Sequence, residues 1–524
     1  MRRKIALFVA GACFHALIVV APVAAQQPRN FPEFTYERVR VEMRDGVKLS
    51  ADIWRPVTPD GVKVPVILQL TPYHQLYSAL DPRETDLPAG DARLFVPKGY
   101  AYVMADVRGT YASGGCWDYG GIKERHDGYD LVEWLGTRDW SNGKVAMTGA
   151  SYDGTTANAA AVERPPHLAT IVPVSAISRW WGYAYQQGTR STYSGESADA
   201  DPPSDTPTDF MFAYGFLPPP DPGALTDAQQ LAMRWDLCDR VEKFMKGYST
   251  QPDYDAFWKE RDYLRLADRV NVPVLVSHGQ LDFNVKTWEG TAWYQALETE
   301  KAMVLGQWPH ASPRGKYLEW DAFLERWFER WLYGVHNGVE DEPSVRVQTN
   351  DGEWHEQSTW GDGRSRRFAL PGKEFGYLDD GALTESEMLR GVGASRYTRV
   401  EVPKSSGIRI QGRPVLHLSA ESDSVSTHFV AVLLDVGAGG QQQVISRAFL
   451  NARYRDGFTK GKDLEPGKRY GFDLEFIDKD HIVAKDHHLE VIIASSSNTW
   501  VAPDENRANN TIFFGDSYLK VPTG

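Results

Sequence analysis

The sequence predicts an α/β domain built on an open, mostly parallel sheet, followed by a β-sandwich. Near-continuous apolar runs alternate with segments of helical spacing, which is typical of parallel strands buried on both faces. These runs lie at 64–70, 100–107, 169–174 and 272–277. From about residue 341 onward the pattern changes to short alternating strands separated by turn signals such as Pro466-Gly467. Such a pattern is typical of a β-sandwich.

The first 25 residues have the pattern of a secretory signal peptide. A cationic start (1–4) precedes an apolar run (5–20), and small residues at 23–25 precede Gln26. We therefore predict a signal peptide at 1–25 and a secreted or periplasmic protein, with an uncleaved membrane anchor as the alternative. No later stretch approaches the ~20 apolar residues that span a bilayer, so we expect no membrane association after cleavage.

Composition sets limits on domain number and partners. The chain has 524 residues and a formal net charge of −13. This length favours two or three domains. Nucleic-acid binding draws its affinity from clustered cationic groups, so we expect no nucleic-acid partner. The oligomeric state is left open.

The first domain is expected at 30–340. Strands at 36–43 and 49–54 are joined by an Asp45-Gly46 turn, which is a strong hairpin signal. A helix is predicted over 128–135, and a strand at 144–148 leads into a helix of small residues. Phe323, Trp327 and Trp331 recur at helical spacing, which indicates a helix that packs on the sheet and closes the domain.

The segment 178–268 interrupts this rhythm. It begins with crowded aromatic residues, among them Trp180 and Trp181, and continues with prolines, acidic residues and a predicted helix at 225–246. We interpret it as a partly helical cap over the sheet, with a solvated surface excursion as the alternative. Trp180, Trp181 and Glu196 are candidate substrate-binding residues. Together with Asp199 and Asp201, Glu196 forms an acidic cluster suited to a substrate ammonium group.

Gly149-Ala150-Ser151-Tyr152-Asp153-Gly154 lies between a predicted strand and a predicted helix. A sharp strand-to-helix turn exposes a serine hydroxyl, and the following helix directs its N–H groups at developing negative charge. The second glycine lies one position later than in the plain G-x-S-x-G pattern. Ser151 is therefore a candidate nucleophile, and a helix N-cap serine is the alternative.

Two further residues complete a possible triad. Asp282 follows the strand at 272–277, and His310 follows a short strand at 303–306. The chain order Ser, Asp, His is that of the α/β-hydrolase triad. In this interpretation His310 is the general base and Asp282 orients it. Taken singly, Asp282 could be a turn residue and His310 a loop histidine.

An oxyanion hole needs two donors. We expect one to be the backbone N–H of Tyr152, directly after the nucleophile. The other should come from Thr71-Pro72-Tyr73-His74, where the phenol of Tyr73 is the likelier donor because Pro72 has no N–H. Tyr73 could instead be a buried aromatic wall, and His74 is a weaker candidate.

Two cysteines, Cys116 and Cys238, remain after signal cleavage. In an oxidising compartment they are a disulfide candidate, with two buried free thiols as the alternative. The second domain, at 341–524, should contain strands near 344–348, 396–402, 415–419, 429–436, 444–449 and 489–494.

These motifs resemble the Xaa-Pro dipeptidyl-peptidase family of serine hydrolases, which includes cocaine esterase and the α-amino-acid ester hydrolases. The matching segments are 71–73, 106–109 with 113–115, 124–135, 149–154, 278–282 and 306–310. The resemblance implies an α/β-hydrolase fold with a C-terminal jelly roll, Ser151, Asp282 and His310 as triad, and Tyr73 with Tyr152 as oxyanion site. The peptidases usually carry a further N-terminal domain for which this chain has no room, so the shorter, esterase-like members are nearer.

Other polar residues are expected to be structural. Asp106 and Arg108 are interpreted as a pair near the site. Glu124, His126, Asp127 and Asp130 lie at a helix start, where acids favour the helix dipole, so no metal is expected there. His487-His488 lacks partners for zinc, and no phosphate-binding loop is present. We expect no cofactor.

The sequence therefore predicts a cofactor-free hydrolase that cleaves an ester, an amide or an N-terminal Xaa-Pro dipeptide through an acyl-enzyme. Its substrates would be small esters or amides, or short peptides. The alternatives are an α-amino-acid ester or β-lactam acylase and a small-ester carboxylesterase. From another class, a secreted carbohydrate-binding protein with a non-catalytic hydrolase scaffold is kept open.

Overall fold

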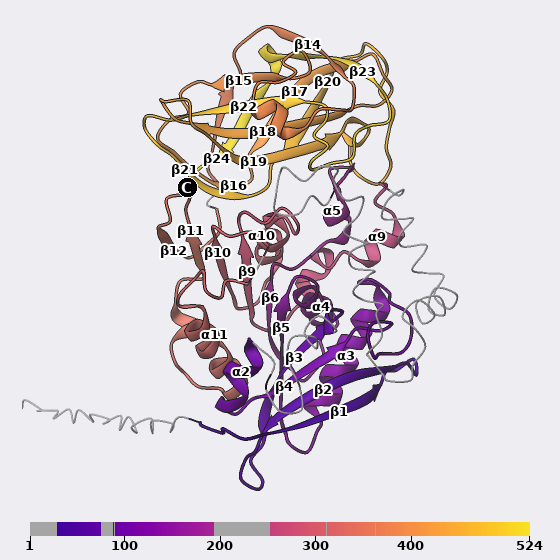
Figure 1. Ribbon diagram of the computed structural model, residues 1–524, viewed down its shortest axis with the longest axis vertical. Helices are drawn as coiled ribbons and strands as arrows, with labels where there is room; N and C mark the ends of the chain where they lie inside the picture. Colours follow the sequence, from indigo (N-terminus) through magenta and orange to yellow (C-terminus); the bar gives the residue numbers. More distant parts are fainter. Residues whose placement is uncertain (1–28, 75–86, 88–89, 193–251, 311, 362) are drawn as a thin grey trace, which may run out of the picture.

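A computed structural model describes residues 29–74, 87, 90–192, 252–310, 312–361 and 363–524. The predicted α/β domain followed by an antiparallel β domain is confirmed (Figure 1). The expected signal peptide and most of the expected cap, including Glu196, Asp199, Asp201 and the helix at 225–246, lie outside the described residues.

The first domain is built on a ten-stranded sheet. Its order is β1 (Phe34–Glu42), β2 (Lys48–Pro56), β4 (Ala101–Asp106), β3 (Val64–Thr71), β5 (Ser141–Ala150), β6 (Leu168–Val174), β9 (Val274–Gly279), β10 (Lys301–Gly306), β11 (Val345–Gln348) and β12 (Trp354–Gln357). Neighbours from β4 to β11 are parallel, and the outer strands β1, β2 and β12 pair antiparallel. The carboxyl ends of the parallel strands therefore meet at one edge of the sheet.

Alternate residues of the central strands supply two cores, one on each face of the sheet. In β3, Leu68 belongs to the core beneath one set of helices and Ile67 to the other core. This double burial is why the strands read as continuous apolar runs. The first core includes α3 (Ile122–Gly136), α4 (Tyr152–Ala161) and α10 (Thr287–Ala296), and the second includes α2 (Asp91–Phe95) and α11 (Trp320–Phe328).

The predicted closing helix is α11. Phe323 and Trp327 are buried on the sheet, and the helix continues into a π-helical turn, Glu329–Tyr333, that carries the half-buried Trp331. The described ends of the expected cap contain α5 (Trp180–Ala184), β7 (Tyr185–Gln186), β8 (Thr189–Arg190), α9 (Ala256–Glu260) and the 3-10 helix Leu264–Arg269.

The expected domain boundary does not coincide with a change of sheet. We expected residues from 341 onward to belong to the second domain, but β11 and β12 extend the first sheet. The reason is that β11 pairs parallel with β10, Met303 opposite Val345, and β12 then returns antiparallel beside it. Strand propensity alone does not reveal which sheet a strand joins.

The second domain consists of antiparallel sheets around its own apolar core. Its strands are β13 (Ser365–Ala369), β14 (Glu374–Asp379), β15 (Thr398–Val402), β16 (Ile408–Gly412), β17 (Val415–Ser422), β18 (His428–Val436), β19 (Gln442–Asn451), β20 (Tyr470–Glu475), β21 (Lys479–Val483), β22 (His488–Ala494), β23 (Ala508–Phe513) and β24 (Tyr518–Pro522), with one short helix, α12 (Glu385–Leu389).

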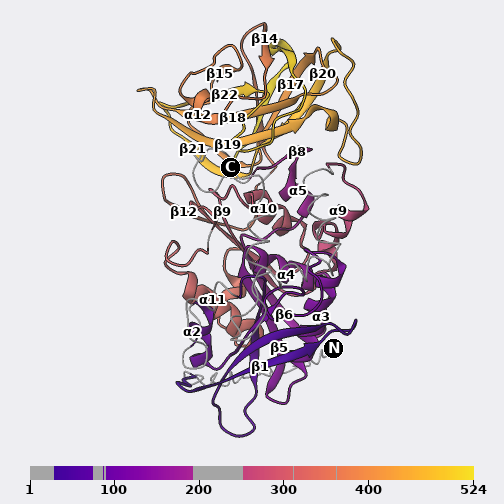
Figure 2. The same cartoon turned by 45° about the vertical axis from the view of Figure 1, so that its right-hand side comes forward.

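The second domain lies over α5 and α10, as both views show (Figures 1 and 2). Gln187, directly after β7, joins the two domains with three hydrogen bonds. Its side chain donates to the Asp473 carbonyl at 3.0 Å and accepts from the Glu475 N–H at 2.8 Å, and its own carbonyl accepts from the Asn451 N–H at 3.1 Å. The beginning of the expected cap is therefore tied to the β domain.

Candidate active site

Ser151 occupies a strained turn between β5 and α4. Its backbone angles are φ 63° and ψ −124°, a conformation that non-glycine residues rarely adopt. The turn is held from both sides, because the Ser151 N–H donates to the Val174 carbonyl at 2.9 Å and its carbonyl accepts from the Thr155 N–H at 3.0 Å. Such over-determined strain is concentrated at functional sites.

The unusual glycine spacing has a steric cause. A Cβ atom at Gly149 would lie 2.3 Å from the Cβ of Asp153, and one at Gly154 would lie 2.7 Å from the Gly149 carbonyl oxygen. Residue 154 lies against the end of β5, so a residue without a side chain is needed at this position. Asp153 is buried and accepts from the Gln69 amide at 2.5 Å.

Asp282 and His310 form a hydrogen-bonded pair after two neighbouring strands, β9 and β10. The Nδ1 atom of His310 lies 2.7 Å from Oδ2 of Asp282, whose side chain is fully buried, whereas that of His310 is 22% exposed. The other carboxylate oxygen accepts the N–H groups of Asn284 at 3.0 Å and Val285 at 2.9 Å. In all of these contacts the carboxylate is placed to accept hydrogen bonds, as an ionised carboxylate does.

The electrostatics of Asp282 agree with this role. Burial raises the pKa of Asp282, but the charge on His310 and the hydrogen bonds from His278 and His310 lower it to about 2. The Nε2 atom of His278 donates to the Val285 carbonyl at 2.7 Å and lies 3.5 Å from Asp282. With Nδ1 donating to Asp282, neutral His310 carries its lone pair on Nε2, the tautomer of a general base.

Tyr73 brings its phenol to the nucleophile. Its hydroxyl lies 3.3 Å from the Ser151 Oγ, and the Tyr152 N–H donates to the same phenol oxygen at 3.4 Å. Both predicted oxyanion donors thus lie beside the candidate nucleophile. The backbone N–H of Tyr73 donates to the Thr71 Oγ1 at 3.0 Å, which fixes the start of this loop at the end of β3.

Sequence reasoning underestimated His74. This residue is fully buried between two carboxylates, with Nε2 3.0 Å from Asp52 and Nδ1 hydrogen-bonded to Asp106, and its ring stacks on Tyr111. Burial lowers the pKa of His74, but the charges and hydrogen bonds of Asp106 and Asp52 outweigh this and raise it above its ordinary value. We infer that an imidazolium anchors the loop that carries Tyr73.

Asp106 and Arg108 do not pair with each other as we expected. Asp106 holds His74, whereas Arg108 makes a two-pronged contact with Asp127 at 2.6 and 2.5 Å and reaches Asp45 at 2.9 Å. β4 ends at Asp106, and Arg108 lies in the turn that follows, where the Thr110 N–H donates to the Val107 carbonyl at 3.0 Å, so the two side chains point to different partners. Both remain structural groups near the site.

The Tyr152 side chain is held in place by two buried hydrogen bonds. Its hydroxyl donates to Glu124 at 2.5 Å and accepts from the Trp117 indole at 2.8 Å. Burial and the nearby Asp118 raise the pKa of Glu124 to about 8. Glu124 is therefore a buried, largely protonated partner of the residue that supplies a backbone oxyanion donor, a role the sequence did not suggest.

The remaining candidates have varied positions. Trp180 is buried against Tyr119 and Tyr152, with ring centroids 4.8 and 5.5 Å apart, while Trp181 faces the second domain. Cys116 forms a disulfide. Its expected partner Cys238 lies outside the described residues, so the pairing stays a prediction.

No group of three or more His, Cys, Asp or Glu side chains among the described residues could hold a metal ion. Within the same residues, no helix has both the length and the apolar character needed to cross a membrane.

Comparison with known proteins agrees with the geometry. Residues 45–312 match a family model described as X-Pro dipeptidyl-peptidase (S15 family), and residues 337–517 match the model of its C-terminal non-catalytic domain. A putative Xaa-Pro dipeptidyl-peptidase of Bacillus anthracis is 27% identical over 86% of this chain and 81% of its own length. Cocaine esterase of a Rhodococcus species is 23% identical over 90% of this chain and 92% of its own length.

Solved structures agree on the fold. The structure of an α-amino acid ester hydrolase superposes with a TM-score of 0.74 at 21% identity, covering 98% of this chain and 100% of that one. A CocE/NonD family hydrolase from Staphylococcus aureus gives a TM-score of 0.75 at 19% identity, covering 94% of each chain. The family match favours an enzyme over the carbohydrate-binding scaffold that the sequence left open.

Proposed function

Because the chain belongs to the X-Pro dipeptidyl-peptidase (S15) family of serine hydrolases, we propose that it cleaves an acyl bond through an acyl-Ser151 intermediate. The observation that carries this proposal is the joint geometry of a strained Ser151 with two donors beside its Oγ and an Asp282–His310 pair after neighbouring strands.

The proposed mechanism follows from these contacts. His310 Nε2 removes the proton of Ser151 as its Oγ attacks the scissile carbonyl carbon. The developing oxyanion accepts hydrogen bonds from the Tyr73 phenol and the Tyr152 N–H. His310 then protonates the leaving alcohol or amine, and a water activated by the same imidazole releases the acyl group. Asp282 stays ionised throughout and stabilises the imidazolium.

We propose that the substrates are small esters, amides or N-terminal Xaa-Pro dipeptide units. The relatives include proteins named as putative Xaa-Pro dipeptidyl-peptidases and a cocaine esterase, which supports this range. A panel of Xaa-Pro anilides, amino-acid esters, β-lactam amides and aryl esters, compared by kcat/KM, ranks these classes.

We also propose export. The cationic, apolar and small-residue segments of 1–25 support cleavage before Gln26. Mass spectrometry of the protein recovered from its native host should find an N-terminus at Gln26. Recovery with residues 1–25 attached would contradict this part of the proposal.

A fluorophosphonate probe tests the nucleophile directly. We expect stoichiometric labelling at Ser151 and complete loss of labelling in Ser151→Ala. The matched control is Ser277→Ala, because Ser277 is buried on β9 and its hydroxyl has no hydrogen-bond partner among the described residues. Absent labelling of folded protein, or persistent labelling of Ser151→Ala, would refute the assignment.

A further inference from the structure

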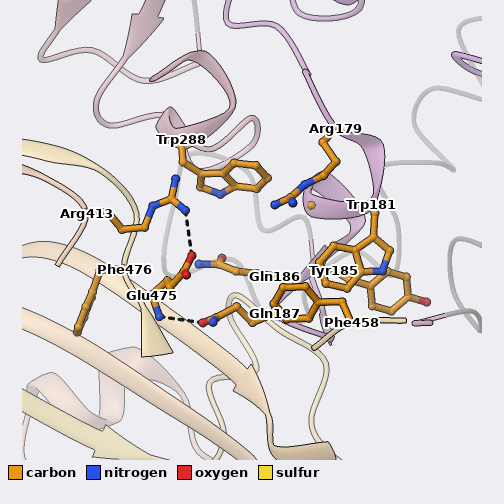
Figure 3. A pocket seen from close by; sticks show the side chains of 11 residues that line it. Arg179, Trp181, Tyr185, Gln186, Gln187, Trp288, Arg413, Phe458, Glu475 and Phe476 are labelled. Carbon is orange, nitrogen blue, oxygen red and sulfur yellow. Dashed lines mark hydrogen bonds and ion pairs between the residues drawn. The ribbon is translucent and has the colours of Figure 1, made fainter. Parts of the chain in front are cut away.

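A pocket lies between the two domains, lined by residues of α5 and α10 and by residues of the second domain (Figure 3). Its cavity volume is about 30 Å³, and it is partly open to solvent. Trp180 of α5 packs on Tyr152, whereas the next residue, Trp181, lines the pocket. Trp288 of α10 and Arg413 of the second domain form other walls. The mechanism proposed above uses none of the pocket's side chains.

Arg179 is the least satisfied charge in this pocket. Its guanidinium is half-buried, 4.9 Å from the Trp288 ring centroid and 5.8 Å from that of Trp181. The guanidinium makes no hydrogen bond or ion pair within the part of the chain that the structure describes, and its Nε is buried without a partner. Its positive charge nevertheless counteracts the burial that raises the pKa of the Asp262 and Glu289 carboxyls. Arg413, across the pocket, is by contrast paired with Asp478 and Glu475, each at 2.9 Å.

Because this half-buried guanidinium has no hydrogen-bonded anion, its N–H groups are available to a ligand carboxylate. Its planar, forked donors match a carboxylate in a two-pronged geometry. Figure 3 shows the Arg179 guanidinium directed between Trp288 and Trp181, so an anion bound there would lie beside two indole rings. The site is therefore suited to a carboxylate attached to an apolar or aromatic group.

Gln186 supplies a second signal. Its side chain is 5% exposed, and its Oε1 has no hydrogen-bond partner among the described residues. A buried amide oxygen without a donor is unfavourable, so a ligand N–H would satisfy it. Gln186 lines the same pocket as Arg179. Together the two side chains call for one ligand that carries both a carboxylate and a nearby N–H.

We propose that this interdomain pocket binds the carboxylate end of an amino acid, either free or as the last residue of a short peptide. Arg179 takes the α-carboxylate, Gln186 accepts the ligand N–H, and Trp288 and Trp181 pack against the ligand side chain. This site is separate from the acyl-transfer centre and goes beyond the hydrolase function proposed above.

Isothermal titration calorimetry of the full chain tests the site with four probes. N-acetyl-L-phenylalanine carries carboxylate, N–H and ring; its C-terminal amide lacks the carboxylate, and 3-phenylpropanoate lacks the N–H. L-phenylalanine distinguishes a free amino acid from a peptide end. We expect N-acetyl-L-phenylalanine to bind at least about tenfold more tightly than its amide, since a charge-assisted pair is lost. Binding to Ser151→Ala should equal binding to the native chain, which separates this site from catalysis.

Variants sharpen the test. Arg179→Gln should weaken the binding of N-acetyl-L-phenylalanine at least about tenfold. Arg138→Gln is the matched control and should change nothing, because Arg138 also lies over an indole, that of Trp134, at 4.3 Å outside the pocket. Gln186→Leu should abolish the preference for N-acetyl-L-phenylalanine over 3-phenylpropanoate. A lack of binding, equal affinity for the amide, or unchanged affinity in Arg179→Gln would overturn the proposal.

Discussion

At the scale of single residues, the phenol of Tyr73 is the test of the oxyanion site. It lies 3.3 Å from the Ser151 Oγ and is the only proposed donor that a substitution can remove. Tyr73→Phe should lower kcat about 100- to 1000-fold, with a much smaller change in KM, because the donor acts on charge that develops in the transition state. Tyr470→Phe, in the second domain, is the control. Steady-state kinetics on an aryl ester measure this, and an unchanged kcat would exclude the phenol.

The lowered pKa of Asp282 predicts that the free energy of unfolding depends on pH. Its pKa in the folded protein is about 2, below its ordinary value, so folding favours the ionised form. This contribution is present above the ordinary pKa of about 4 and is lost as the pH falls toward 2. It amounts to about 2 kcal/mol. Asp282→Asn should therefore lose less free energy of unfolding than the native chain between pH 5 and pH 2.

The same variant should lower kcat by about 10⁴-fold, because the asparagine amide no longer holds the correct His310 tautomer. Urea unfolding at several pH values measures the stability, and ester hydrolysis measures kcat. Asp139→Asn is the control, since Asp139 is exposed. Parallel pH curves for Asp282→Asn and the native chain would contradict the first expectation, and a nearly native kcat would contradict the second.

At the scale of elements, the loop after β3 depends on the cluster of His74, Asp52 and Asp106. His74→Gln leaves the buried Asp106 without its cation, whereas Asp52 keeps a two-pronged ion pair with Arg38 at 2.6 and 2.9 Å, so we expect a loss of about 3 kcal/mol at pH 6. The pKa of His74 is raised, so its contribution is complete below about 6.5 and is lost as the pH rises through the raised value. The loss caused by His74→Gln should therefore shrink at high pH.

Two companion variants separate this cluster from a general destabilisation. Adding Asp106→Asn to His74→Gln should recover part of the stability, since one of the two carboxylates becomes neutral. The control is His336→Gln, because the His336 side chain is 80% exposed. Urea unfolding at pH 6 and pH 9 gives the free energy of unfolding of the native chain and of each variant. A pH-independent loss would show that His74 acts by packing rather than by charge.

The elements also show what sequence could and could not reveal. Ser151 directly follows β5, and Asp282 and His310 lie three and four residues after the ends of β9 and β10, so local pattern and chain order selected them as the predicted triad. The partners of His74 were not predictable in this way, because its contact with Asp52 and Asp106 depends on β2 and β4 lying side by side. The contact between Glu124 and Tyr152 likewise depends on α3 packing on α4, which periodicity does not specify.

At the scale of the whole molecule, the two fold classes were predictable because each strand type has its own apolar pattern. The boundary between the domains was not, since β11 and β12 join the first sheet through pairing. The second domain also contacts the loop that carries Asp282: Phe283, next to Asp282, packs on Trp500 with ring centroids 5.0 Å apart. Lys479 of β21 places its ammonium 5.0 Å from the Phe283 ring centroid.

The last prediction concerns Lys479, a buried amine at the contact between the second domain and the loop that carries Asp282. Its side chain is 3% exposed, its Nζ has no hydrogen-bond partner among the described residues, and burial with the nearby Arg447 lowers its pKa to about 7. Folding therefore disfavours the charged form, and this penalty grows as the pH falls from about 10 to below 7. Lys479→Met keeps the volume and removes the charge. It should raise the free energy of unfolding by about 1–4 kcal/mol at pH 6 and by less at pH 9.

Thermal and urea unfolding at the two pH values measure the gain. Lys520→Met is the control, since Lys520 is exposed on β24 and should show no gain at either pH. A loss of stability in Lys479→Met at pH 6 would mean that the ammonium is paired in solution and that its charge stabilises the contact between the second domain and the Asp282 loop. A gain without loss of ester hydrolysis would instead show that the second domain supports the Asp282 loop through apolar packing, with Phe283 and Trp500 as its contact.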